Sequence, residues 1–171
     1  MNYRGYGQSA GAPSEAALVA DALALYDHAL TLPGADPTRI YAFGRSLGSG
    51  VAVRLASERP VDRLVLVTPF DSLVNLAKEY FRWLPVGLLL RDRYDSAGRA
   101  QKVTAPVLLV VAGEDEIVPM RRSQALAVVR SSDDDLRMRR RNARTGDELA
   151  ALLGGDVGLA IAASAAQVFP S

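Results

Sequence analysis

The sequence contains no cysteine, which excludes disulfide bonds, thiolate catalysis and cysteine-based metal sites. Neither sign of charge dominates: 20 basic and 19 acidic residues leave a net charge of +1, so overall charge predicts no nucleic-acid partner. No apolar run is long enough to span a bilayer, and the first residues lack the apolar core of a signal peptide. We expect no membrane span, no metal ion or other cofactor and, by default, a cytoplasmic location.

What remains is a chain of ordinary size and composition. Of its 171 residues, 49% are hydrophobic, which is enough to form a core. No internal repeat divides the sequence. We therefore expect residues 1–171 to form a single domain.

The most informative stretch is RIYAFGRSLGSG, Arg39–Gly50, in which an apolar run stops and a helical pattern begins. At the junction stands the G-x-S-x-G pattern of a nucleophile elbow, a tight turn between a strand and a helix. We expect the turn to require glycine at Gly44 and Gly48, because a Cβ at either position would clash within the turn. Ser46 Oγ would then be lifted out of the sheet. The alternative is that Ser46 merely caps the following helix.

Short, almost continuously apolar runs alternate with helical patterns along the chain. This alternation predicts an α/β fold with a mostly parallel sheet and helices on both faces. Beyond the strand before Gly44, we expect strands at Arg63–Thr68 and Pro106–Ala112. Helices are expected from Glu15 after a Ser14 N-cap, after the elbow, from Ser72 to about Trp83, and over 84–91, 97–102, 123–129, 147–153 and 156–169.

Together with the segments NYRGYGQSAG, LVTPFDS, LLRDRYDS and VLLVVAGEDEIVP, the elbow resembles the α/β-hydrolase superfamily, specifically its serine-aminopeptidase-like and esterase-like branch. The resemblance covers roughly residues 2–129, and 130–171 diverge. It implies a partial α/β-hydrolase core and the chain order Ser, acid, His. The nucleophile would be Ser46, the acid Asp115, and one oxyanion donor the backbone N–H of Leu47. The implied activity is that of a serine hydrolase on a small-molecule acyl substrate, an ester, thioester or small amide, through an acyl-enzyme.

A second carboxylate competes for the role of the acid. Asp71 follows the second expected strand, and some α/β-hydrolases place their acid there. Otherwise Asp71 caps the next helix, which is a common use of aspartate. We prefer Asp115, because it lies four positions before Pro119 in the family's Asp-x-x-x-Pro turn.

The sequence departs from the family in two ways. The family's base is a histidine after the acid, but the sequence has one histidine, His28, within the first expected helix. Only Met1 precedes the loop that begins at Asn2, so the flanking strands and the second oxyanion donor are predicted to be missing. A second hypothesis is therefore an incomplete, catalytically impaired hydrolase scaffold that self-associates through an exposed sheet edge.

The stretch Arg130–Arg144 contains six arginines and three aspartates where the family has an apolar strand. Only Leu136 and Met138 alternate as a half-buried strand would. Three interpretations stay open: a basic binding surface, a solvated sheet edge, or a shift of reading frame near Val129. The interspersed aspartates and the lack of aromatic residues disfavour nucleic acid as a partner.

Overall fold

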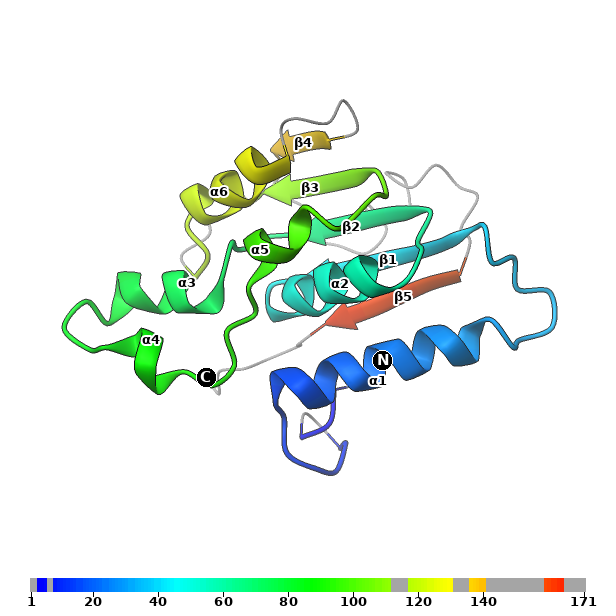
Figure 1. Ribbon diagram of the computed structural model, residues 1–171, viewed down its shortest axis with the longest axis horizontal. Coiled ribbons are helices and arrows are strands. Elements are labelled where there is room, and N and C mark those ends of the chain that lie inside the picture. The colour runs from blue at the N-terminus through cyan, green and yellow to red at the C-terminus, as the bar shows by residue number, and fades with distance from the viewer. Residues whose placement is uncertain (1–2, 6–7, 112–116, 131–135, 141–158, 165–171) are drawn as a thin grey trace.

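The computed structural model describes residues 3–5, 8–111, 117–130, 136–140 and 159–164, and in this part of the chain five strands form one sheet. The strands are β1 (Ile40–Arg45), β2 (Arg63–Val67), β3 (Val107–Val111), β4 (Leu136–Arg140) and β5 (Leu159–Ser164). They lie in the order β4-β3-β2-β1-β5, and each neighbouring pair is parallel (Figure 1). The predicted α/β class with a parallel sheet is confirmed.

The register of the strands brings their carboxyl ends to one edge of the sheet. Arg45, the last residue of β1, lies opposite Val67 in β2 and Ser164 in β5. Val67 in turn lies opposite Val110 in β3. Open parallel sheets bind ligands beyond the carboxyl ends of their strands. The residues that follow β1, β2 and β3 are therefore the place to look for a site.

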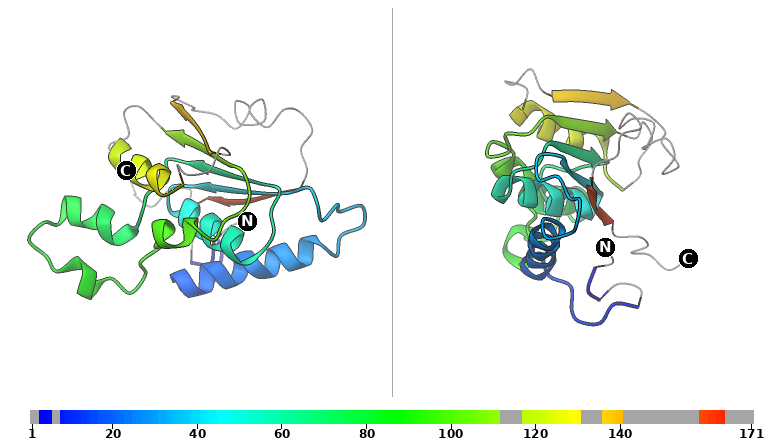
Figure 2. Two further views of the ribbon diagram at one scale, coloured as in Figure 1. Left: turned by 45° about the horizontal axis from the view of Figure 1, so that its top comes forward. Right: turned by 90° about the vertical axis from the view of Figure 1, so that its right-hand side faces the viewer.

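The helices lie on one face of this sheet in the part of the chain that the structure describes (Figure 2). They are α1 (Glu15–Ala29), α2 (Leu47–Glu58), α3 (Leu73–Tyr80), α4 (Val86–Leu89), α5 (Ser96–Ala100) and α6 (Met120–Arg130). We predicted helices on both faces, and none of the described helices covers the second. Because the strand order steps in one direction from β1 to β4, right-handed crossovers place the connecting helices on the same side. None of these helices is long and apolar enough to cross a membrane.

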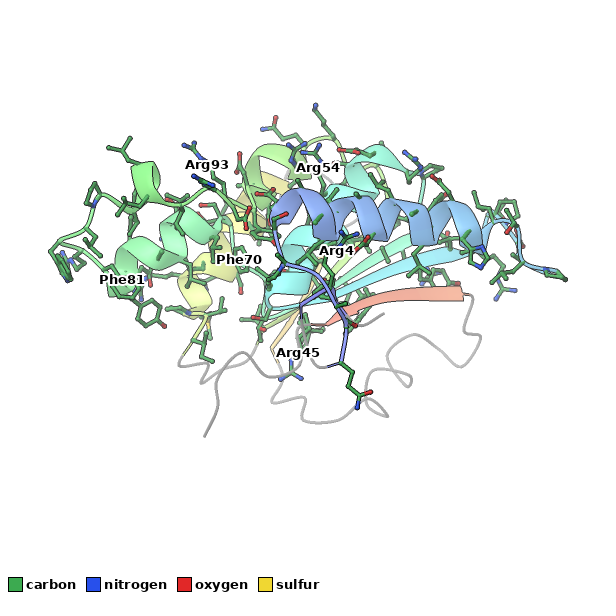
Figure 3. The ribbon with its side chains drawn as sticks, turned by 90° about the horizontal axis from the view of Figure 1, so that it is seen from below. Arg4, Arg45, Arg54, Phe70, Phe81 and Arg93 are labelled. Atoms are coloured by element: carbon green, nitrogen blue, oxygen red, sulfur yellow. The ribbon has the colours of Figure 1, made fainter. Side chains whose placement is uncertain are left out.

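Two clusters of buried side chains attach the helices to the sheet. The larger lies between the sheet and α1, α2, α5 and α6, and includes Ile40, Leu55, Leu64, Leu66 and Leu109. The smaller surrounds the start of α2, with Tyr3, Leu18, Ala22, Val51, Phe70, Leu76, Tyr94 and Val118. Figure 3 shows Phe70 between the sheet and the pair α3–α4. Full burial of a large apolar side chain contributes roughly 1.5–3 kcal/mol. The smaller cluster therefore holds several segments against the elbow.

The N-terminal end of α1 is as predicted. The Ser14 hydroxyl accepts a hydrogen bond from the backbone N–H of Ala17 at 3.2 Å, which satisfies one of the unpaired donors of the first turn. Leu18, Ala22 and Ala29 are buried along one face, and Ala22 and Leu18 reach the cluster around the elbow. The sequence pattern thus correctly placed the start of this helix and its cap.

The prediction for the C-terminal segment was wrong at Leu159–Ser164. We expected this alanine-rich run to be helical, but it forms β5 and pairs with β1 along its length. Alanine favours helices intrinsically, but pairing with a neighbouring strand overrides so small a preference. The edge of β1 that we expected to be exposed is therefore covered by β5. The edges of the described sheet are β4 and β5.

Leu136 and Met138 both lie in a strand, β4, which pairs with β3. This part of the arginine-rich stretch is an edge strand of the sheet. The helix predicted over 147–153 lies outside the described residues.

The loop before α1 is tied to that helix by an ion pair, in which the Arg4 guanidinium donates to both carboxylate oxygens of Asp21. These hydrogen bonds lower the pKa of Asp21 below its ordinary value. A lowered pKa in the folded state stabilises the fold above the unfolded pKa of about 4. This contribution is lost as the pH falls through the lowered pKa.

We therefore expect Asp21→Asn to lower the thermal unfolding midpoint at pH 7, and to lower it less and less as the pH falls below about 4. The effect is small because both side chains are partly exposed. Circular dichroism melts of both proteins over this pH range measure it. A midpoint difference that stays constant down to pH values well below 4 would contradict the assignment.

Candidate active site

Ser46 stands between β1 and α2 with an unusual backbone conformation, φ 50° and ψ −121°. Residues with a side chain rarely adopt a positive φ, and such strain collects at functional sites. The conformation is held from both sides. The backbone N–H of Ser46 donates to the Val67 carbonyl at 3.0 Å, and its own carbonyl accepts from the N–H of Ser49 at 2.8 Å and from the Ser49 hydroxyl at 2.6 Å. Ser49 itself is fully buried.

The alternative that the Ser46 side chain caps the following helix is wrong. Ser46 occupies the N-cap position of α2, but its hydroxyl makes no capping hydrogen bond. The serines at the N-caps of α1 and α3 do make one: the hydroxyls of Ser14 and Ser72 accept from Ala17 and Asn75. The Ser46 side chain is half-buried. Its hydroxyl is therefore not engaged in holding the helix that follows.

Gly44 is a glycine because α2 passes directly over it. A Cβ built there would lie 2.3 Å from the carbonyl oxygen of Gly48 and 2.7 Å from Cβ of Ala52. The nearest obstacle is backbone and cannot rotate away. The predicted clash at Gly44 is confirmed, and Gly48 is buried in the first turn of α2, where its carbonyl makes this close contact. The two glycines of the motif thus meet each other across the turn.

Leu47 is the first residue of α2. The first N–H groups of a helix have no carbonyl partner within the helix, and the helix dipole makes this end favourable for negative charge. The backbone N–H of Leu47 is thus of the type that can stabilise an oxyanion formed beside Ser46.

His28 does not lie beside the serine. It is exposed in the last turn of α1, and its neighbour Asp27 forms an ion pair with Arg59 at 2.9 Å. Arg59 caps the carboxyl end of α2, whereas Ser46 stands at its beginning. The 12 residues of α2 span about 18 Å. The prediction that His28 lies within the first helix is confirmed.

The preferred acid, Asp115, lies outside the described residues. What the structure gives is the strand before it: β3 ends at Val111, on the edge of the sheet where Ser46 lies. β3 itself lies two strands away from the nucleophile strand β1. The assignment of Asp115 as the acid stays a prediction.

The alternative acid, Asp71, is buried in a network of hydrogen bonds. Its carboxylate accepts from the Asn75 side chain at 2.6 Å and from the Arg122 guanidinium at 3.2 and 3.3 Å. The expectation that Asp71 caps α3 was wrong, since Ser72 does so. Asp71 instead connects the segment after β2 to the start of α6.

The long-range partner of Asp71, Arg122, was not found by sequence reasoning. Arg122 also lies 2.8 Å from Glu79 of α3, and the buried hydroxyl of Ser123 donates to the Pro69 carbonyl at 2.6 Å. Sequence separations above 40 residues leave no local pattern by which such contacts could be detected. We call these contacts of Arg122 and Ser123 the α6 latch.

The described residues contain no group of three or more His, Cys, Asp or Glu side chains that could hold a metal ion.

Comparison with known proteins gives no match to a protein-family model. An uncharacterised protein of Mycobacterium tuberculosis is 46% identical over 126 residues, which are 74% of this chain and 45% of that protein. A lysophosphatidylserine lipase of Danio rerio is 33% identical over 144 residues, 74% of this chain and 37% of the lipase. The chain spans less than half of the length of these curated relatives.

Solved structures resemble the chain in fold. An α/β-hydrolase from Vibrio vulnificus superposes with a TM-score of 0.71 at 22% identity, covering 90% of this chain and 60% of that one. A monoacylglycerol lipase from Paleococcus ferrophilus superposes with a TM-score of 0.59 at 22% identity, covering 88% of this chain and 79% of the lipase. At this level of identity, the likeness establishes a shared fold.

The contact at Gly44 predicts that Gly44→Ala is destabilising. A methyl group there cannot be accommodated unless α2 moves away from β1, and overpacking of this kind costs about 1–3 kcal/mol or more. Gly87→Ala on α4 is the matched control, because a Cβ there would meet only Val74 at 3.7 Å, an ordinary contact. Urea unfolding curves measure both. Equal stability of the two variants would contradict the close approach of α2.

Proposed function

Because this chain belongs to the α/β-hydrolase superfamily, we propose that it is a serine hydrolase that cleaves carboxylic esters, thioesters or small amides through an acyl-enzyme on Ser46. The observation that carries the proposal is the conformation of Ser46. Its backbone is held at φ 50° between a strand and a helix, and its hydroxyl makes no capping bond. A strained serine on such a turn is typical of a nucleophile.

The proposed chemistry uses the groups at the elbow. Ser46 Oγ attacks the acyl carbonyl carbon, the negative charge forms on the carbonyl oxygen, and the backbone N–H of Leu47 stabilises it. Collapse of this intermediate leaves an ester on Ser46 and expels the alcohol, thiol or amine, which takes up the proton that the base accepted from Ser46. Water then attacks the same carbonyl and releases the carboxylic acid. Asp115 is proposed to orient the base that accepts the serine proton.

Esters are the first substrate class to test. The relative from Danio rerio is named a lysophosphatidylserine lipase, and a lipase cleaves carboxylic esters. Activated esters also demand least of a nucleophile without a strong base, because their leaving group departs without a proton.

A second candidate function is supported by the position of His28. The only histidine of the sequence lies at the far end of α2 from Ser46, so it does not supply the base. A hydroxyl without a base is a weak nucleophile at neutral pH. The alternative proposal is therefore a catalytically impaired scaffold that associates with other copies through the edge strands β4 or β5.

If Ser46 is the nucleophile, the chain should hydrolyse short p-nitrophenyl esters slowly, and added imidazole should accelerate the reaction by acting as the base. In a serine protease, the oxyanion hole and binding alone retain about 10³–10⁴-fold catalysis over water. Release of p-nitrophenolate is followed with and without imidazole. The imidazole-dependent rate should disappear in Ser46→Ala, after subtraction of the reaction that imidazole gives without protein.

The matched control is Ser57→Ala, which removes a hydroxyl group from the same helix, α2. This hydroxyl donates only to the Arg54 carbonyl. The variant should retain the full rate. Turnover that persists in Ser46→Ala would exclude Ser46 as the nucleophile. The absence of turnover in the unmodified chain, together with a dimer in sizing experiments, would favour the scaffold.

Substitution of each candidate acid is expected to affect a different property of the protein. Asp115→Asn should lower the imidazole-assisted rate by at least about tenfold, because the carboxylate no longer orients the base. Asp71→Asn should instead lower the free energy of unfolding by about 1–3 kcal/mol, because the partly buried Arg122 guanidinium loses one of its two carboxylate partners. Kinetics and urea unfolding are measured on both variants, with Glu114→Gln as the carboxylate control. The reverse pattern would make Asp71 the acid.

A further inference from the structure

The segment 80–89 carries exposed apolar side chains at the end of the arm formed by α3 and α4. Trp83 is 80% exposed and Leu88 is 87% exposed, and Tyr80, Phe81 and Leu89 are also largely exposed. Figure 3 shows Phe81 at the end of the arm that is farthest from the sheet, and Figures 1 and 2 show the arm extending past the carboxyl ends of the strands. We call residues 80–89 the apolar tip. Such a gathering of apolar surface marks an interaction site.

The arm that carries the tip is anchored at its base. Leu76 and Val86 are buried, and the Tyr80 hydroxyl donates to the Ile117 carbonyl at 2.8 Å. The Arg93 guanidinium donates to the Gly87 carbonyl at 3.2 Å. The exposed side chains are thus the outward face of a held structure.

Positive charge lies beside the tip. A depression between α3 and the start of α6 is lined by Asn75, Lys78, Glu79, Arg82, Arg121 and Arg122. Glu79 pairs with Arg121 and Arg122. Lys78 and Arg82 are exposed and form no ion pair with any residue that the structure describes. The depression therefore has more cations than its one carboxylate can neutralise.

We propose that the apolar tip and this cationic depression dock the chain on the surface of a phospholipid bilayer with anionic headgroups. Tryptophan and tyrosine favour the interface between lipid and water, and apolar side chains next to Lys and Arg are typical of helices that lie on anionic membranes. The two helices of the arm have 8 and 4 residues, whereas a span needs about 20, so they would lie in the interface.

The charges argue against a second copy of the chain as the occupant. A symmetric contact through the same surface would bring Lys78 and Arg82 of one copy toward those of the other, and like charges in contact oppose association. An anionic lipid surface satisfies the apolar and the cationic parts together.

Docking does not depend on the proposed function, since it requires no acyl transfer. It would turn the edge of the sheet that carries Ser46 toward the bilayer, because the arm extends from that edge.

Trp83 is the only tryptophan of the sequence, so tryptophan emission, excited at a wavelength where tyrosine does not absorb, reports on the tip alone. The full chain is titrated with vesicles of phosphatidylcholine, and with vesicles that also contain phosphatidylglycerol. We expect a blue shift and quenching by brominated lipid with the anionic vesicles, a much weaker response with the neutral ones, and loss of binding at high salt. Ser46→Ala should bind like the unmodified chain.

Variants test the two parts of the surface separately. Leu88→Asp should abolish the blue shift, and Lys78→Gln and Arg82→Gln should each weaken binding about fivefold. The controls lie away from the arm: Leu32→Asp, an exposed apolar side chain after α1, and Arg63→Gln at the start of β2 should bind normally.

The proposal is overturned if anionic vesicles leave the Trp83 emission unchanged, or if Leu88→Asp binds them like the unmodified chain. It is also overturned if the blue shift arises without lipid as the protein concentration rises and a dimer disappears in Leu88→Asp. That last result would make the tip an interface between copies.

Discussion

The close approach of α2 to β1 at Gly44 is the constraint on which the rest of the site depends. With a hydrogen in place of a side chain, the carbonyl of Gly48 and the methyl group of Ala52 can pass directly over the end of the strand. The chain must then reverse within one residue, and Ser46 takes up a positive φ to do so. Strain of this kind costs about 1–3 kcal/mol and persists only where the surroundings enforce it.

The enforcing contacts come both from the first turns of α2 and from distant parts of the chain. The buried Ser49 hydroxyl holds the Ser46 carbonyl, and Val51 of the same helix packs in the smaller cluster with Tyr3 and Phe70. The α6 latch joins the segment after β2 to the start of α6, through the bond from Ser123 to the Pro69 carbonyl. The elbow, the segment after β2 and the start of α6 therefore form one connected region. Asp71 contributes to that connection, which explains its burial without a catalytic role.

Sequence reasoning was reliable where one local pattern determined the outcome. The apolar run before Gly44, the Ser14 cap and the glycine at the turn each depend on neighbours within a few residues, and each was found. It failed where distant partners decided. Leu159–Ser164 became a strand because β1 was available to pair with it, and Asp71 lost the capping role to Ser72 while gaining Arg122 as a partner. The exposure of the apolar tip likewise could not be predicted from its composition, since a buried helix can have the same composition.

The pairing of β5 with β1 has a consequence for how the chain folds. β1, β2, β3 and β4 are neighbours in the sheet in the same order as in the sequence, so each can pair as soon as the next has been synthesised. Ile40 and Leu159, in contrast, are neighbours in the sheet although more than a hundred residues separate them in the sequence. Closing so long a loop is entropically the most expensive step and tends to be slow. The strand that leads to Ser46 would thus acquire its second neighbour late, and until then its unpaired backbone is open to other extended chains.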